Sequence, residues 1–205
     1  MSGLFLSLDG VDGAGKSTQV ERLIAWFNQQ GRVVISPRDP GSTALGEALR
    51  EILLHRKEIP LSMTAEMLLY MASRAQLVRE IIHPALAAGQ VVIADRYLLA
   101  NVVYQGCAGG ENVEHIWQVG NIATGGLLPQ LTIILDVPVE VALGRLSGGL
   151  DRLESRGQEY MQRVRDGFLQ QAQRLGDAAL VVDASQTPEE IHAAIISALT
   201  SMRLN

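Results

Sequence analysis

The sequence has little of several features that would define a class of protein. Its 205 residues contain one cysteine, Cys107, so no disulfide can form within the chain and a reducing compartment is expected. No uninterrupted apolar run reaches the roughly 18 residues that a membrane-spanning helix needs, and the first residues lack the basic stretch of a signal peptide. We therefore expect a cytoplasmic protein with no membrane segment.

A basic excess is also lacking. The 17 Lys and Arg against 22 Asp and Glu give a net charge of −5, whereas proteins that coat nucleic acid usually carry a basic excess. No Asn is followed by Lys, so the Asn-Lys-x-Asp motif that reads guanine in the commonest GTPases is absent. Repeats, low-complexity tracts and Pro/Gly/Ser linkers are absent too, which favours one domain over residues 1–205.

Short apolar runs alternate with segments of helical periodicity. Because these runs are continuously apolar, they predict parallel strands that are covered on both faces. The predicted strands are 4–8, 33–35, 91–94, 131–135 and 180–182, and the predicted helices include about 43–55, 62–88 (long, or broken near Pro84) and 188–202. The pattern predicts a three-layer α/β/α sandwich with a five-stranded parallel sheet and with ligands at the carboxyl ends of the strands.

A glycine-rich turn follows the first predicted strand and matches G-x-x-x-x-G-K-[ST]. Glycines let successive N–H groups point at a phosphate, and the following helix N-terminus favours negative charge. Lys16 can reach the outer phosphates, and the Ser17 hydroxyl can ligate Mg²⁺. We expect this turn to bind ATP through Gly10, Val11, Asp12, Gly13, Ala14, Gly15, Lys16, Ser17 and Thr18. The turn alone does not separate a kinase from an ATP-driven motor.

Polar residues after two other strands predict a second anion site. Asp95 ends the third strand, where an acidic group that orients Mg²⁺ is expected, but Asp136 fits the same pattern after the fourth strand. Arg96 favours Asp95, because a guanidinium there can hold an anionic acceptor; a strand-end salt bridge is the alternative. Arg38, in the turn after the second strand, would lie at the same edge and help to hold a phosphate in line for attack. A solvated loop arginine is the alternative for Arg38.

Other candidates are weaker from the residues alone. Tyr70 and Arg74 share a helix face and could stack on a base and donate to it, although their spacing alone favours a packing pair. Tyr104 and Gln105 offer a phenol and an amide but mean little in isolation. Several arginines follow the fourth strand close to Ser147-Gly148-Gly149, where a flexible lid of about residues 145–157 could close over a triphosphate. The arginines nearest the glycines, Arg145 and Arg152, are the candidates; the others suit a solvated helix face.

Together these segments resemble the thymidylate kinase family, whose members are nucleoside-monophosphate kinases that convert dTMP and ATP to dTDP and ADP for dTTP synthesis. The resemblance covers essentially the whole chain. It rests on the order and spacing of residues 10–18, 38–41, 70–74, 95–97, 104–106 and 150–154.

The resemblance implies a role for each matching residue in the acceptor site. Asp12 resembles the acid that approaches the acceptor's 3′-hydroxyl, and Asp95 resembles the acid of the Mg²⁺ and phosphate network. Arg38 and Arg96 look like ligands of the acceptor phosphate, and Tyr70 stands where the family stacks an aromatic ring on thymine. The remaining contacts implied are Arg74 to the base, Tyr104 to the deoxyribose and Gln105 to the base.

The resemblance also implies catalytic roles and a partner. Gly13 stands where some members carry an arginine, so the catalytic arginine is expected from the lid, as Arg145 or Arg152. With these, the expected catalytic residues are Lys16, Arg38 and Arg96. Family members are generally homodimers that act on small nucleotides, which makes a self-association face on the helix over 62–88 plausible, with no nucleic acid or membrane partner.

Three residues depart from the family pattern: Asp39 replaces Glu, Ser42 replaces Gly, and Tyr70 replaces Phe. The lid also has few charges. Two alternatives therefore stay open: a P-loop kinase for another nucleotide or a deoxynucleoside, and a non-catalytic nucleotide-binding relative.

Overall fold

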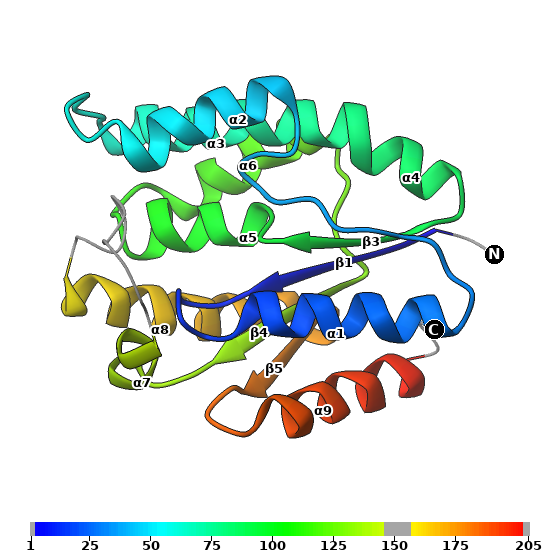
Figure 1. The fold of residues 1–205 in the computed structure, drawn as a ribbon. Coiled ribbons are helices and arrows are strands. Elements are labelled where there is room, and N and C mark those ends of the chain that lie inside the picture. Colours follow the sequence, from blue (N-terminus) through cyan, green and yellow to red (C-terminus); the bar gives the residue numbers. More distant parts are fainter. Residues whose placement is uncertain (1–2, 146–156, 203–205) are drawn as a thin grey trace.

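The computed structural model describes residues 3–145 and 157–202 and contains one sheet of five parallel strands in the order β2-β3-β1-β4-β5 (Figure 1). The strands are β1 (Leu4–Asp9), β2 (Val34–Ile35), β3 (Val91–Asp95), β4 (Leu131–Asp136) and β5 (Ala179–Asp183). The predicted five-stranded parallel sheet is confirmed. The predicted strand limits differ from the observed ones by at most one residue at either end.

Helices cover both faces of the sheet, which gives the predicted three layers (Figure 1). Helices α1 and α9 contact each other and lie on one face, while α4, α5 and α8 lie on the other, where α4 contacts β3 and α8 contacts β4 and β5. The helix bounds are α1 (Lys16–Gln29), α2 (Ala44–Arg50), α3 (Met63–Leu77), α4 (His83–Ala87), α5 (Leu98–Asn101), α6 (Val113–Thr124), α7 (Val139–Arg145), α8 (Gln158–Leu175) and α9 (Pro188–Ser201).

The long helix predicted over 62–88 is continuous but not regular. A π-helical segment, η2 (Val78–Ile82), joins α3 to α4 immediately before Pro84. Proline has no N–H and clashes with the carbonyl of a regular helix, and the wider π turn lets the helical run pass it. Two further π segments, η1 (Glu51–His55) and η3 (Val102–Cys107), extend α2 and α5, and a short 3₁₀ turn, η5 (Gly176–Ala178), precedes β5.

The central strand β1 sets the position of the site. It pairs with β3 on one side and with β4 on the other, so the strand order reverses beside it, and such a switch point leaves a crevice at the carboxyl edge of the sheet. The register places Leu8 of β1 opposite Asp95 of β3. Fully buried side chains such as Phe5, Leu6 and Ile93 fix these strands in the core. Among the described helices, none has the length and apolar character needed to cross a bilayer.

Candidate active site

A cavity of about 500 Å³ opens at the carboxyl edge of the sheet. It joins the glycine-rich turn, here called the phosphate loop (residues 10–18), to the turn after β2 and to the inner faces of α3 and α5. Its lining residues are Asp12, Gly13, Gly15, Lys16, Ser17, Thr18, Arg38, Asp39, Pro40, Arg50, Leu54, Tyr70, Arg74, Asp95, Arg96, Ala100, Asn101, Tyr104, Gln105 and Arg145. Most of the predicted site residues therefore line one cavity.

The phosphate loop has a backbone that suits only glycine at three points. Gly10, Gly13 and Gly15 have φ of 133°, 82° and 92°, all in the region that L side chains rarely adopt. A Cβ on Gly13 would lie 2.2 Å from the carbonyl oxygen of Ala142 in α7. The loop is thus packed directly against the backbone of α7, and no side chain fits at position 13 without moving that helix.

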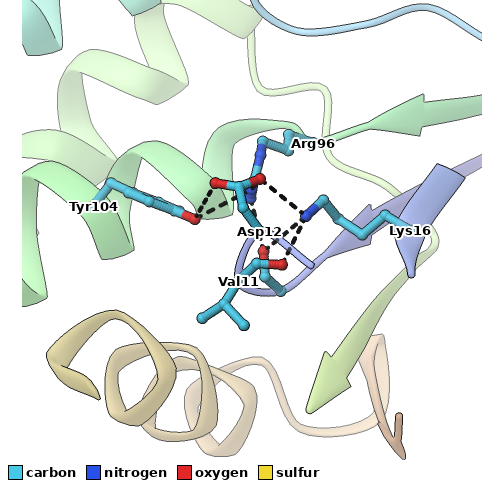
Figure 2. Close-up of polar contacts among 6 residues, drawn as sticks. Val11, Asp12, Lys16, Arg96 and Tyr104 are labelled. Atoms are coloured by element: carbon cyan, nitrogen blue, oxygen red, sulfur yellow. Dashed lines mark hydrogen bonds and ion pairs between the residues drawn. The ribbon is translucent and has the colours of Figure 1, made fainter. Parts of the chain in front are cut away.

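The Lys16 ammonium is buried within the loop. Its Nζ donates to the carbonyl oxygens of Val11 at 2.9 Å and Gly10 at 3.2 Å, and it lies 3.5 Å from Asp12 Oδ1 (Figure 2). Burial lowers the pKa of Lys16, and the positive charge of Arg96 adds to this effect, while neighbouring carboxylates oppose it.

Arg96 connects the phosphate loop to the opposite wall of the cavity. Its Nη1 donates to the Gly10 carbonyl at 2.9 Å, and its Nη2 donates to Asp12 Oδ1 at 2.6 Å and to the Tyr104 hydroxyl at 3.1 Å (Figure 2). Its backbone has φ 68°, a strained conformation for a non-glycine residue and one that clusters at functional sites. The guanidinium is therefore held in place at a cost in backbone conformation.

Two carboxylates near Arg96 have pKa values that are shifted in opposite directions. Burial opposes ionisation of Asp12, but the charges of Arg96 and Lys16 outweigh it and hold the pKa of Asp12 below its usual range. Asp9, at the end of β1, is fully buried, and this burial raises its pKa to about 6 despite the attraction of Arg96 and Lys16. Asp12 is thus ionised at neutral pH.

The two acidic candidates at the strand ends also differ. Asp136 forms a two-pronged salt bridge with Arg165 of α8, with N–O distances of 2.6 and 2.9 Å, and does not line the cavity. Asp95 lines the cavity, as does Ser17, and its buried Oδ1 has no hydrogen-bond partner among the described residues. A buried carboxylate oxygen and a hydroxyl are hard oxygen ligands of the kind that Mg²⁺ prefers.

Arg38 lies at the mouth of the cavity and is half exposed. Its Nη2 forms an ion pair with Glu47 of α2 at 3.2 Å, and its backbone N–H donates to the Ser42 hydroxyl at 2.8 Å. Ser42 has φ 65°, a conformation that glycine adopts at lower cost. A third arginine, Arg50 of α2, also lines the cavity and donates from Nη1 to the Pro40 carbonyl at 3.0 Å.

The inner wall of the cavity carries Tyr70 and Arg74 from α3, both buried. Arg74 Nε donates to Asp39 Oδ2 at 2.6 Å, and the side chains of this salt bridge are only 2% and 0% exposed. Arg74 also donates to the Tyr97 carbonyl at 3.3 Å and lies over the Tyr97 ring. Arg74 is therefore held by a buried salt bridge and hydrogen bonds, and the packing pair that its spacing suggested is not its main contact.

Tyr104 and Gln105 come from η3, on the wall opposite the phosphate loop. The Tyr104 hydroxyl lies 3.4 Å from Asp12 Oδ2, and its backbone carbonyl accepts a hydrogen bond from the Tyr160 hydroxyl at 2.7 Å. Burial raises the pKa of Tyr104 well above its usual value, and Arg96 opposes this only in part. Gln105 is buried as well and lines the cavity.

The structure describes one of the two lid arginines, Arg145. Arg145, at the end of α7, lines the cavity and donates from Nη1 to the Ala184 carbonyl, after β5, at 3.0 Å. Arg152 and most of the predicted lid lie outside the described residues.

The sequence reasoning missed several residues of the cavity and its walls. Arg50 and Asn101 line it directly, and Glu66 lies buried behind it. Its spacing in the sequence could have identified Glu66. It precedes Tyr70 by four residues and Arg74 by eight, which places all three on one face of α3.

A phosphate loop at the switch point of a parallel sheet, opening into a cavity that further arginines line, is typical of a P-loop phosphotransferase.

Comparisons with known proteins identify the family. A profile of thymidylate kinases matches residues 8–195. The chain is 46% identical over 202 residues to a thymidylate kinase from Bifidobacterium longum (strain DJO10A), covering 96% of this chain and 97% of that one. It is 44% identical over 189 residues to one from Rhodopirellula baltica, covering 92% of this chain and 77% of that one.

A solved structure agrees. The crystal structure of thymidylate kinase from Ehrlichia chaffeensis matches with a TM-score of 0.79 and 27% identity, covering 97% of this chain and 99% of that one. The chain belongs to the thymidylate kinase family. The expectation of an enzyme, a nucleoside-monophosphate kinase that phosphorylates dTMP, is confirmed, and no comparison favours another acceptor or a non-catalytic relative.

Proposed function

We propose that the chain transfers the γ-phosphoryl group of ATP to dTMP across the cavity at the carboxyl edge of the sheet. The observation that carries this assignment is the position of Arg96. Its guanidinium contacts both the phosphate loop and Tyr104 on the opposite wall, so an anion at this point lies between the two halves of the cavity.

The phosphate loop forms the donor half. Its N–H groups and the N-terminus of α1 suit the phosphates of ATP, and Lys16 supplies a charge within reach of the outer phosphates. Ser17 and Asp95 would hold Mg²⁺, which supplies neutralisation of phosphate charge when it is bound. Arg145 and Arg152 are the proposed lid arginines.

The acceptor half divides into a phosphate end and a base end. Arg38, Arg50 and Arg96 line the phosphate end, where their guanidiniums suit two-pronged contact with phosphate oxygens. Tyr70, Arg74 and Gln105 form the wall of the base end. Tyr70 stacks on the thymine ring, and the other two donate to or accept from its edge.

The sugar lies between these two ends. Tyr104 lies against the deoxyribose, and Asp12 accepts from its 3′-hydroxyl, because the Asp12 carboxylate is ionised and faces the cavity. The transfer needs no covalent intermediate and no strong base. Lys16 and Arg96 stabilise the charge on the transferring group, while the acceptor arginines hold the attacking oxygen in line.

The assembly and compartment are also part of this proposal. Helix α3 contacts both α2 and α6, and each of these three helices carries an exposed large apolar side chain: Leu45, Leu68 and Ile122, the last 79% exposed. Such a surface suits a homodimer built on α3 and its neighbours. We place the enzyme in the cytoplasm, where ATP and nucleoside monophosphates are its available substrates.

A coupled assay of ADP release tests the proposal. The purified chain is assayed with ATP and Mg²⁺ against dTMP, dUMP, dCMP and thymidine. We expect turnover with dTMP at the highest kcat/KM and none with thymidine, which has no phosphate for Arg96 to hold. Release of ADP that does not depend on a monophosphate would overturn the assignment.

A further inference from the structure

Five buried polar side chains form an unbroken line of hydrogen bonds along the base end of the cavity. Gln105 Nε2 donates to Glu66 Oε1 at 2.7 Å, and Asn101 Nδ2 donates to Gln105 Oε1 at 2.6 Å. Arg74 Nη1 donates to Asn101 Oδ1 at 3.1 Å, and Arg74 Nε donates to Asp39. Each of the five side chains belongs to a residue that is at most 3% exposed.

The two charged ends of this line give it one direction. An arginine side chain can only donate, so the Asn101 oxygen must face Arg74 and its amide nitrogen must face Gln105. A carboxylate oxygen can only accept, so the Gln105 nitrogen must face Glu66 and its oxygen must face Asn101. Both ends demand the same orientation of the two amides, so neither amide can rotate without breaking a buried hydrogen bond.

We propose that Glu66 is a positioning residue for base selection: through the Gln105 amide, it makes the cavity accept a pyrimidine that donates from its ring N3. Glu66 itself does not line the cavity, whereas Gln105, Asn101 and Arg74 do. This inference rests on the proposed contact between Gln105 and the base.

The fixed direction leaves a particular pattern facing the base. The Gln105 oxygen has a second lone pair, which can accept from the N3–H of thymine or uracil, and Arg74 can donate to their O4. Cytosine has the opposite edge, with an amino group in place of O4 and an acceptor at N3. Against this wall the cytosine amino group would face the Arg74 donor, and its N3 acceptor would face the Gln105 oxygen. Buried polar groups that are left unpaired in this way give strong discrimination.

The experiment compares two substitutions at position 66. Glu66→Gln keeps the size of the side chain, but its amide can donate as well as accept, so position 66 no longer opposes a turned-over Gln105 amide and only the Arg74 end of the line still does. Glu66→Asp shortens the side chain but keeps an acceptor-only group. A role in packing alone predicts that the Gln variant is the milder one, whereas a role in direction predicts the reverse for selectivity.

The measured quantity is the ratio of kcat/KM for dTMP to kcat/KM for dCMP. This ratio does not depend on the folded fraction of the enzyme, so partial misfolding of a variant does not obscure it. We expect Glu66→Gln to lower the ratio roughly tenfold and to raise KM for dTMP, with kcat within about twofold of wild type, because the base end is remote from the transferring group. Glu66→Asp should keep a ratio closer to that of wild type.

A matched control is Glu111→Gln. Glu111 follows η3 and accepts from the Thr64 hydroxyl of α3 at 2.6 Å, so it also links these two segments, but on the exposed side. This variant should leave the ratio and KM unchanged. A Glu66→Gln enzyme that keeps the wild-type ratio, or a Glu66→Asp enzyme that loses more selectivity than Glu66→Gln, would overturn the inference. Failure of the wild-type chain to phosphorylate dTMP would instead refute the proposed function.

Discussion

Arg96→Lys is the substitution that tests the site most directly, because it keeps the positive charge and removes only the planar guanidinium with its several donors. Arg96 reaches the Gly10 carbonyl, Asp12 and Tyr104 with its two terminal nitrogens, and a single ammonium cannot hold all three. Losing two such hydrogen bonds, each worth about 1 to 2 kcal/mol in a partly buried site, lowers the free energy of unfolding by about 2 to 4 kcal/mol. The strained backbone conformation stays, since lysine has no greater freedom there than arginine.

The catalytic effect should be separate from the stability effect and similar to it in free energy. Arginine can hold the phosphate at two points, whereas lysine holds it at one. Removing one fixed donor from a developing negative charge lowers kcat/KM roughly 10²-fold to 10³-fold. The coupled ADP assay with dTMP measures this loss at a temperature where the variant is fully folded. Arg174→Lys is the control, because Arg174 forms a two-pronged pair with Glu114 on the surface, away from the cavity. An Arg96→Lys enzyme within about threefold of the wild-type kcat/KM would refute the role assigned to Arg96.

Three further predictions follow from the same geometry. Lys16→Met should lower kcat/KM by at least about 10²-fold while far-ultraviolet circular dichroism stays unchanged, because the ammonium supplies charge and not fold; normal turnover would contradict this. Gly13→Ala should lower the free energy of unfolding by about 2 kcal/mol or more in urea titrations, since its Cβ meets the Ala142 carbonyl and its φ is positive; an unchanged midpoint would count against it. Asp9→Asn should gain stability relative to wild type as pH rises. The folded Asp9 carboxyl has a pKa of about 6 against 3.8 in the unfolded chain, so protonation stabilises the folded state fully below pH 3.8, and this contribution is lost as pH rises through about 6. The difference in unfolding free energy between Asp9→Asn and wild type should therefore grow by about 2 kcal/mol from about pH 4 to about pH 8, and a constant difference would refute it.

Local patterns predicted most of the fold. Each strand is a continuous apolar run. The phosphate loop is a contiguous motif whose local backbone conformation requires glycine, as the positive φ of Gly10 and Gly13 shows. The order of strands in the sheet was not predicted, because the rule of right-handed crossovers fixes the handedness of each connection and not the order. The π segments were not predicted, because their extra residue leaves the apolar pattern nearly unchanged, and the short helix α5 was not predicted either.

The acceptor site was harder to predict because its contacts join distant parts of the chain. From spacing alone, Arg74 favoured a packing pair with Tyr70, yet its main partner, Asp39, lies 35 residues away in sequence. Glu66 and Arg50 are charged residues on helices, and a single charged residue on a helix usually faces solvent. The burial of Glu66 and the partial burial of Arg50 depend on tertiary packing, which a sequence pattern of one helix does not encode.

We also expect Asp12 to link the affinities of the two nucleotides. One oxygen of this carboxylate accepts from Arg96 and lies near Lys16, and the other lies 3.4 Å from the Tyr104 hydroxyl. A triphosphate that draws Lys16 away, or a monophosphate that draws Arg96 away, would change the hydrogen bonds that the Asp12 carboxylate can accept from the second ligand. By linkage, the factor by which ATP changes the dissociation constant of dTMP must equal the factor by which dTMP changes that of ATP.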